Sequence, residues 1–75
     1  MKLRNVLIET FPKSNIPESI EDLKMGDLNE WDSLGHFNLI LAIEQRFSVQ
    51  FDMEQIGKIR SIRDIQEFLK SNDAN

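Results

Sequence analysis

The stretch WDSLGHFNLILAIEQRF, residues 31–47, decides the fold of this 75-residue chain. Asp32 is a preferred helix-capping residue, because its carboxylate can accept the unpaired amide hydrogens of a first helical turn. Apolar residues then recur at helical spacing, and several of them fall on one side of the predicted helix. This stripe consists of Leu39, Ile40, Ile43 and Phe47. The pattern predicts a helix from about Ser33 to Phe47 with the stripe in the core.

A second apolar ridge lies beside this stripe and consists of Leu34, Phe37 and Leu41. Two interpretations of this ridge stay open. It is either ordinary core that faces the preceding connection, or an exposed surface on which a partner docks.

Helical periodicity predicts further elements on both sides of this helix. Leu3, Val6, Leu7 and Phe11 form an apolar stripe that stops at Pro12, which predicts a first helix. Asp52 offers a cap for a short helix over 53–56 that ends at Gly57. Ser61 and Asp64 resemble a capping box for a last helix, whose buried stripe is Ile62, Ile65, Phe68 and Leu69.

The connection over residues 12–31 is predicted to be irregular, because two prolines and Gly26 interrupt any period. A short turn of helix is expected at 18–23. Apolar residues should pin the connection onto the core: Ile16, Ile20, Leu23, Met25 and Leu28. The polar tail SNDAN, residues 71–75, is expected to fray. The predicted fold is all-α, a small four-helix bundle of three main helices plus one short helix, in a single domain over 1–75.

The composition excludes several classes of function. The 13 acidic and 9 basic residues give a formal net charge of −4, the wrong sign for a surface that neutralises nucleic-acid phosphates. The absence of cysteine and the single histidine exclude disulfides and give no support to a metal site. No apolar run approaches the roughly 20 residues that span a bilayer. We therefore expect a cytoplasmic protein that binds neither nucleic acid nor membrane.

Ser33 is the residue of this stretch best placed for chemistry. If Asp32 caps the helix, Ser33 occupies the first helical position with its hydroxyl directed toward solvent. A phosphate ester there faces unpaired amides and the positive end of the helix dipole, which favours negative charge by roughly 0.3–1 kcal/mol at an exposed site. The alternative is that Ser33 is itself only the cap.

Asp32-Ser33-Leu34 at the helix start, Phe47 at its end and IRSIRDI, residues 59–65, resemble the acyl carrier protein family, as do the length, the acidity and the element order. The resemblance implies that a phosphopantetheinyl transferase attaches 4′-phosphopantetheine from coenzyme A to Ser33. The thiol of this arm then holds an acyl or aminoacyl group as a thioester. We expect a monomeric carrier, not an enzyme, served by an acyl or aminoacyl ligase and by a downstream transferase or synthase.

The resemblance also implies a docking surface on the same helix, where apolar residues flanked by acids meet partner enzymes. The corresponding residues here are Leu34, Phe37, Leu41, Glu30 and Glu44. Positions that are often acidic in fatty-acid carriers hold Gly35, Asn38, Gln45 and Arg46 instead. This departure favours a specialised pathway, such as secondary metabolism, cell-surface modification or aminoacyl transfer, over ordinary fatty-acid synthesis.

Two further alternatives stay open. His36, three residues after Ser33, is either a polar residue at the rim of the core or part of the mouth of an acyl pocket, and no group is evident that would orient it as a catalytic base. The rival function from another class is a non-enzymatic helical protein-interaction module. In that case the ridge of Leu34, Phe37 and Leu41 binds a partner and Ser33 is only the first residue of a helix.

Overall fold

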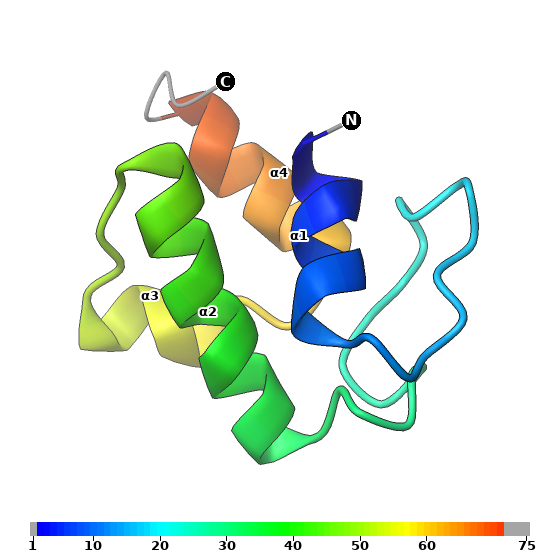
Figure 1. Ribbon diagram of the computed structural model, residues 1–75. Coiled ribbons are helices and arrows are strands. Elements are labelled where there is room, and N and C mark those ends of the chain that lie inside the picture. The colour runs from blue at the N-terminus through cyan, green and yellow to red at the C-terminus, as the bar shows by residue number, and fades with distance from the viewer. Residues whose placement is uncertain (1, 72–75) are drawn as a thin grey trace.

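The computed structural model describes residues 2–71, and these residues form four helices (Figure 1). The helices are α1 (Lys2–Thr10), α2 (Ser33–Phe47), α3 (Met53–Lys58) and α4 (Ile62–Ser71). The predicted all-α bundle of three main helices and one short helix is confirmed. Of the tail expected to fray, Ser71 is the last residue of α4, and residues 72–75 lie outside the described residues.

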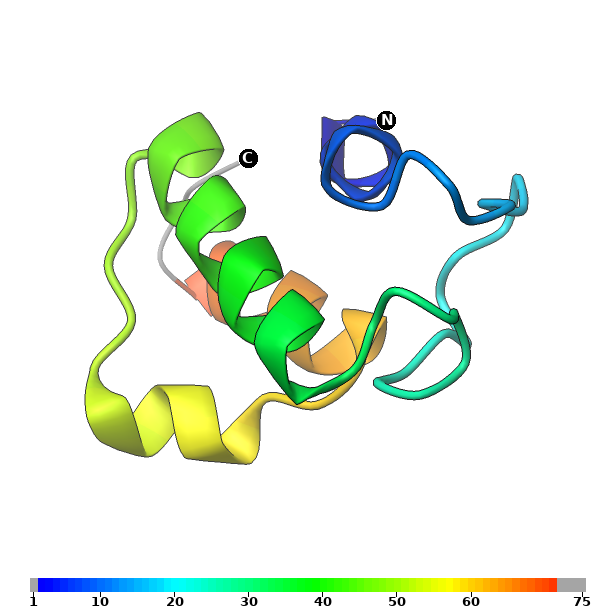
Figure 2. The same ribbon diagram turned by 60° about the horizontal axis from the view of Figure 1, so that its bottom comes forward.

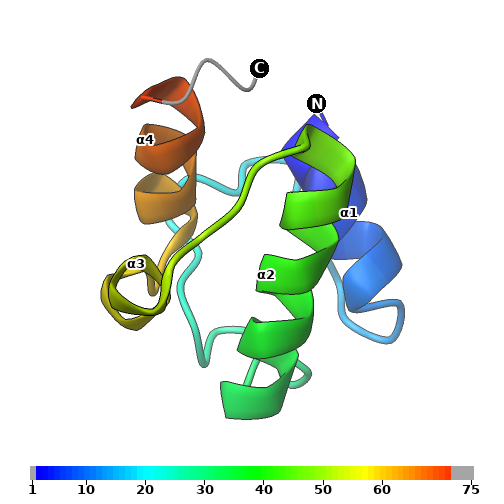
Figure 3. The same cartoon turned by 90° about the vertical axis from the view of Figure 1, so that its left-hand side faces the viewer.

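The helices surround one core. α1 packs against α2, and α4 stands across the core from both, while the short α3 lies crosswise to α2 and α4 (Figure 3). The long connection between α1 and α2 occupies the side of the molecule away from α3 (Figure 2). The first turn of α2 lies at the end of the bundle opposite the start of α1 and the end of α4 (Figure 1).

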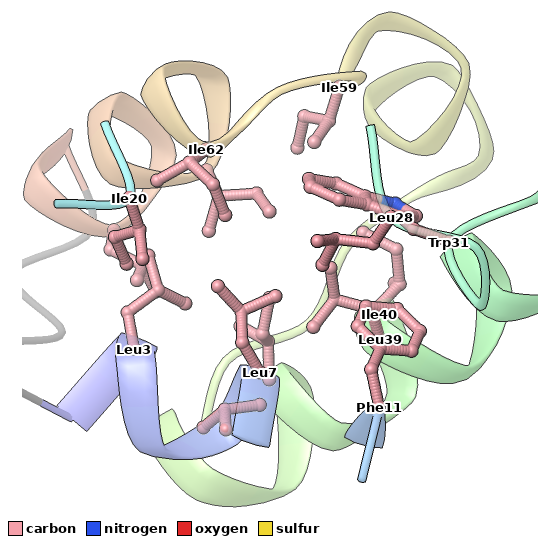
Figure 4. Close-up of a cluster of buried hydrophobic side chains, with 14 of the residues drawn as sticks. Leu3, Leu7, Phe11, Ile20, Leu28, Trp31, Leu39, Ile40, Ile59 and Ile62 are labelled. Atoms are coloured by element: carbon pink, nitrogen blue, oxygen red, sulfur yellow. The ribbon is translucent and has the colours of Figure 1, made fainter. Parts of the chain in front are cut away.

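The predicted stripes build the core (Figure 4). Each buried leucine or isoleucine contributes about 1.5–3 kcal/mol from apolar surface removed from water. The buried residues of the helices and their flanks include Leu3, Val6, Leu7, Phe11, Leu39, Ile40, Ile43, Ile62, Ile65 and Leu69. Phe47 and Phe68 are partly buried against them. Trp31, which the periodicity did not assign to the core, is fully buried.

The connection before α2 is pinned onto the core as predicted. Ile20 and Leu28 are buried, and its other apolar residues, Ile16, Leu23 and Met25, are partly buried. The short helical turn expected at 18–23 does not form. The segment has one hydrogen-bonded turn that is not helical, in which the Leu23 amide donates to the Ile20 carbonyl over 3.0 Å. Neighbouring carbonyls have distant partners instead: Arg4 binds those of Ile16 and Pro17, and the Ile62 amide binds that of Leu23.

Two local predictions need correction around α3 and α4. Gly57 does not end α3 but lies inside it, because the hydrogen bonds continue to the Ile59 amide, which donates to the Gln55 carbonyl over 3.0 Å. Ser61 does accept from the Asp64 amide, but the Asp64 carboxylate accepts from the Arg60 amide and not from the Ser61 amide that a capping box requires. Ser61 also pairs with Lys24 in an isolated antiparallel bridge that the sequence did not predict.

Among residues 2–71 we find no helix with the length and apolar character needed to cross a bilayer.

Candidate functional site

The candidate site is the start of α2, and Asp32 caps it as predicted. The Asp32 backbone is extended, and its Oδ1 accepts a hydrogen bond from the Gly35 amide over 2.8 Å. The Asp32 carbonyl accepts from the His36 amide over 2.8 Å, which begins the hydrogen-bond ladder of α2. Ser33 is therefore the first residue of the helix, and the alternative in which Ser33 is the cap is wrong.

The Ser33 side chain is exposed, and its hydroxyl makes no hydrogen bond to any residue of the described range 2–71. Other serines are committed to neighbours: Ser14 donates to Glu30, Ser19 donates to Glu21, and Ser61 accepts from the Asp64 amide. The first turn of α2 contains no acidic residue, so its positive end is offset only by the Asp32 cap. Ser33 thus combines a free hydroxyl with a setting that favours an attached anion.

Gly35 allows the preceding connection to pack closely against the start of α2. A Cβ atom at this position would overlap the Glu30 carbonyl oxygen and would lie 3.2 Å from a ring carbon of Phe11. Only glycine allows the backbone of residue 30 to approach the helix so closely. The absence of an acidic side chain at position 35, which favoured a specialised carrier, therefore also has a packing cause.

A hollow of about 260 Å³ lies beside Ser33, between the start of α2 and α3. Its lining mixes the polar groups of Ser33, His36 and Arg60 with the apolar side chains of Met25, Ile56 and Ile59.

The ridge of Leu34, Phe37 and Leu41 is exposed, so its interpretation as ordinary core is wrong. The three side chains keep 71%, 50% and 43% of their surface accessible, whereas Leu39 on the core side of the same helix is fully buried. Exposed large apolar side chains that lie together typically mark an interaction site. The ridge begins at Leu34, directly after Ser33.

The acids predicted to flank the ridge have structural partners. Glu30 Oε1 accepts from the Lys13 amide over 2.8 Å and from the Ser14 hydroxyl over 3.1 Å, which fixes the turn after α1. Glu44 Oε2 accepts from the Phe51 amide over 2.8 Å and holds the connection between α2 and α3. The sequence did not predict these roles, because both contacts cross between elements. A part for either residue in partner binding stays a prediction.

Arg46, at one of the positions often acidic in fatty-acid carriers, forms an ion pair with Glu9 of α1. Two basic residues of α3 and α4 are paired as well: Lys58 with Glu54, and Arg63 with Asp22. The hydrogen bond to the Asp22 carboxylate, together with its charge, raises the pKa of the Arg63 guanidinium. These exposed pairs contribute little to stability.

His36 is buried, with 8% of its surface accessible, and both ring nitrogens have partners. The Trp31 indole N–H donates to Nδ1 over 2.9 Å, and Nε2 lies 2.7 Å from the Ile59 carbonyl oxygen. Neither nitrogen is free to take a proton from Ser33, so the pair does not form a catalytic dyad. His36 lies at the edge of the core, as the first interpretation predicted, and it also lines the hollow beside Ser33. Its part in an acyl pocket stays a prediction.

Comparison with known proteins finds two similar bacterial proteins. The acyl carrier protein of Coprothermobacter proteolyticus is 32% identical over 71 residues, which cover 95% of this chain and 85% of that protein. The acyl carrier protein of Helicobacter hepaticus is 34% identical over 58 residues, which cover 75% of this chain and 68% of that protein. No family model matches the chain. No solved structure matches it either.

Proposed function

Because the chain belongs to the acyl carrier protein family, we propose that Ser33 carries a 4′-phosphopantetheine arm, which supplies a terminal thiol that holds acyl groups as thioesters. The protein is a carrier and not an enzyme. The observation that carries the assignment is the free hydroxyl at the first position of a long, capped helix.

The residues around Ser33 fit such an arm. The phosphodiester is an anion, and the start of α2 presents unpaired amides and the positive end of a 15-residue helix. The Asp32 carboxylate accepts a hydrogen bond from the Gly35 amide and makes none to the Ser33 hydroxyl. The hollow next to Ser33 gives the arm room along the surface.

In the loading reaction, the Ser33 oxygen bonds to the coenzyme A phosphorus nearer the pantetheine. The diphosphate linkage breaks there, and the adenosine bisphosphate portion leaves. The hydroxyl proton passes to a base on the transferase, because no basic side chain among residues 2–71 is hydrogen-bonded to Ser33. Ser33 thus supplies the nucleophile, Asp32 keeps the first turn ordered, and the phosphopantetheinyl transferase supplies the catalysis.

The exposed ridge of Leu34, Phe37 and Leu41 is the surface on which we place the partner enzymes. These are the transferase, an acyl or aminoacyl ligase, and a downstream transferase or synthase. Glu30 and Glu44 are expected to flank this surface, although each also accepts a backbone amide within the molecule. The weak acidity of α2 supports a carrier for a specialised pathway.

Incubation with coenzyme A and a transferase of broad specificity tests the assignment by intact mass. The protein should gain one phosphopantetheine, and Ser33→Ala should abolish the gain because no oxygen remains to form the ester. Ser19→Ala is the matched control, since Ser19 is also exposed and should leave the gain unchanged. A folded wild-type protein that gains no mass would favour the interaction module, whose exposed ridge needs no arm.

A further inference from the structure

Three residues form a hydrogen-bonded lock beneath Ser33: Trp31, His36 and Ile59. Because an indole N–H can only donate, His36 Nδ1 must accept the bond from Trp31. The single proton of the neutral imidazole then lies on Nε2, which donates to the Ile59 carbonyl over 2.7 Å. Both nitrogens are therefore satisfied inside the protein, and the ring has one fixed orientation.

The lock joins elements that are distant in sequence. Trp31 ends the long connection, His36 lies in the first turn of α2, and Ile59 is the cap residue directly after α3. The indole packs beside the Phe11 ring, with centroids 6.0 Å apart. It is nearly coplanar with the His36 ring, whose centroid lies 6.1 Å away, as their in-plane hydrogen bond requires. Figure 4 shows Trp31 within the core cluster together with Phe11, Leu28 and Ile59. Two hydrogen bonds, which lie among packed aromatic rings, thus connect the start of α2 with the residue that follows α3.

This bridge forms part of the wall of the hollow beside Ser33, because His36 and Ile59 both line it. An alkyl chain that entered the core between His36 and Ile59 would have to separate the His36 imidazole from the Ile59 carbonyl. Both groups would then be buried among apolar atoms without a hydrogen-bond partner, which is unfavourable. Short acyl groups need no such shelter, because they expose little apolar surface to water.

We infer that the lock excludes long alkyl chains from the bundle, so that the cargo is a short acyl group of a few carbons carried in solvent. This inference rests on the proposed attachment of an arm to Ser33 and adds to it the class of cargo. The thioester remains open to water and to small nucleophiles until a partner enzyme takes up the acyl group.

Thioester cleavage by hydroxylamine tests the inference on the full chain. A transferase loads the protein from acetyl-coenzyme A or decanoyl-coenzyme A, and intact mass follows the loss of each acyl group. Each rate is divided by that of the same acyl-pantetheine free in solution. The two ratios should agree, and the fluorescence of Trp31, the single tryptophan, should be the same with both acyl groups.

Protection of the decanoyl thioester by about tenfold, which means a sheltered state ten times as populated as the open one, would overturn the inference. In His36→Leu, which removes both hydrogen bonds, the decanoyl thioester should become protected. If that variant does not fold, His36→Phe, which keeps a ring at this position and also removes both hydrogen bonds, replaces it in the test. A decanoyl thioester that stays open in the folded variant would show that the lock is not the barrier. No mass gain in the loading step would overturn the proposed function itself.

Discussion

The starts of α2 and α3 share one type of cap and differ in what lies behind it. In both, an aspartate carboxylate accepts an amide hydrogen over 2.8 Å, from Gly35 to Asp32 and from Gln55 to Asp52. Gln55 completes a capping box, because its side chain accepts from the Asp52 amide over 3.0 Å. Gly35 has no side chain and leaves its space to the Glu30 carbonyl. Tertiary packing therefore holds the start of α2, whereas local side chains hold that of α3.

The difference continues along the two helices. α2 buries Gly35, His36, Leu39, Ile40 and Ile43, whereas α3 has no buried residue. The first turn of α3 also contains Glu54, while the first turn of α2 contains no acid. A cap by itself thus does not make a site. At α2 the cap is combined with buried residues that pack the helix against the core, with a first turn that contains no acidic residue, and with the free hydroxyl of Ser33.

The largest expected effect is a loss of stability, and it compares the buried face of α2 with α3. Leu39→Ala should lower the free energy of unfolding by about 2–5 kcal/mol, since it removes a fully buried side chain from the core. Ile56→Ala in α3 should cost clearly less, because Ile56 is only partly buried. Urea denaturation measures both variants.

Leu34→Ala on the exposed side of α2 is the control. It should change stability by no more than about 0.5 kcal/mol and should slow loading by the transferase. Equal stability losses for Leu34→Ala and Leu39→Ala would show that the ridge is core after all.

Two glycines give the next comparison. Gly35→Ala should lower the free energy of unfolding by about 1–3 kcal/mol, because the added Cβ overlaps the Glu30 backbone and the neighbours must shift. Gly57→Ala in α3 should instead raise it by about 0.4–1 kcal/mol, since nothing lies within 4 Å of its Cβ position and the unfolded chain loses freedom. Thermal unfolding of both variants measures these two changes in stability. A neutral Gly35→Ala would remove the packing explanation for this residue.

Periodicity and capping were sufficient to predict the helices. The apolar stripe of α2 and the cap residues Asp32 and Asp52 are local signals, and the structure confirms them. The same reasoning placed the end of α3 at Gly57, where the hydrogen bonds in fact continue. Glycine is compatible with both outcomes, and only the contacts of the following residues decide between them.

The contacts between elements could not be predicted from the sequence. Trp31, His36 and Ile59 give no periodic signal, and their hydrogen bonds require the fold to bring residues 23 positions apart together. The same holds for Glu44 and the Phe51 amide and for Glu30 and Lys13. The position of Ser33 as first helical residue was predictable from the neighbouring aspartate. Whether the ridge beside it was core or surface could not be predicted, because both faces of α2 are apolar.

The smallest expected effect concerns the caps themselves and separates structure from recognition. Asp32→Ala and Asp52→Ala should each cost about 1 kcal/mol of stability, whereas Asn caps nearly as well as Asp, so Asp32→Asn should cost little. If the exposed Asp32 carboxylate also attracts a basic transferase, Asp32→Asn should still lower kcat/KM for modification of Ser33, and Asp52→Ala should not. Added salt should slow the wild-type reaction, because such attraction is screened within about 8 Å at physiological ionic strength. Modification kinetics and denaturation midpoints of the four proteins provide the test. If Asp32→Asn reacts as fast as wild type, Asp32 acts only as a cap, and the starts of α2 and α3 differ through their packing alone.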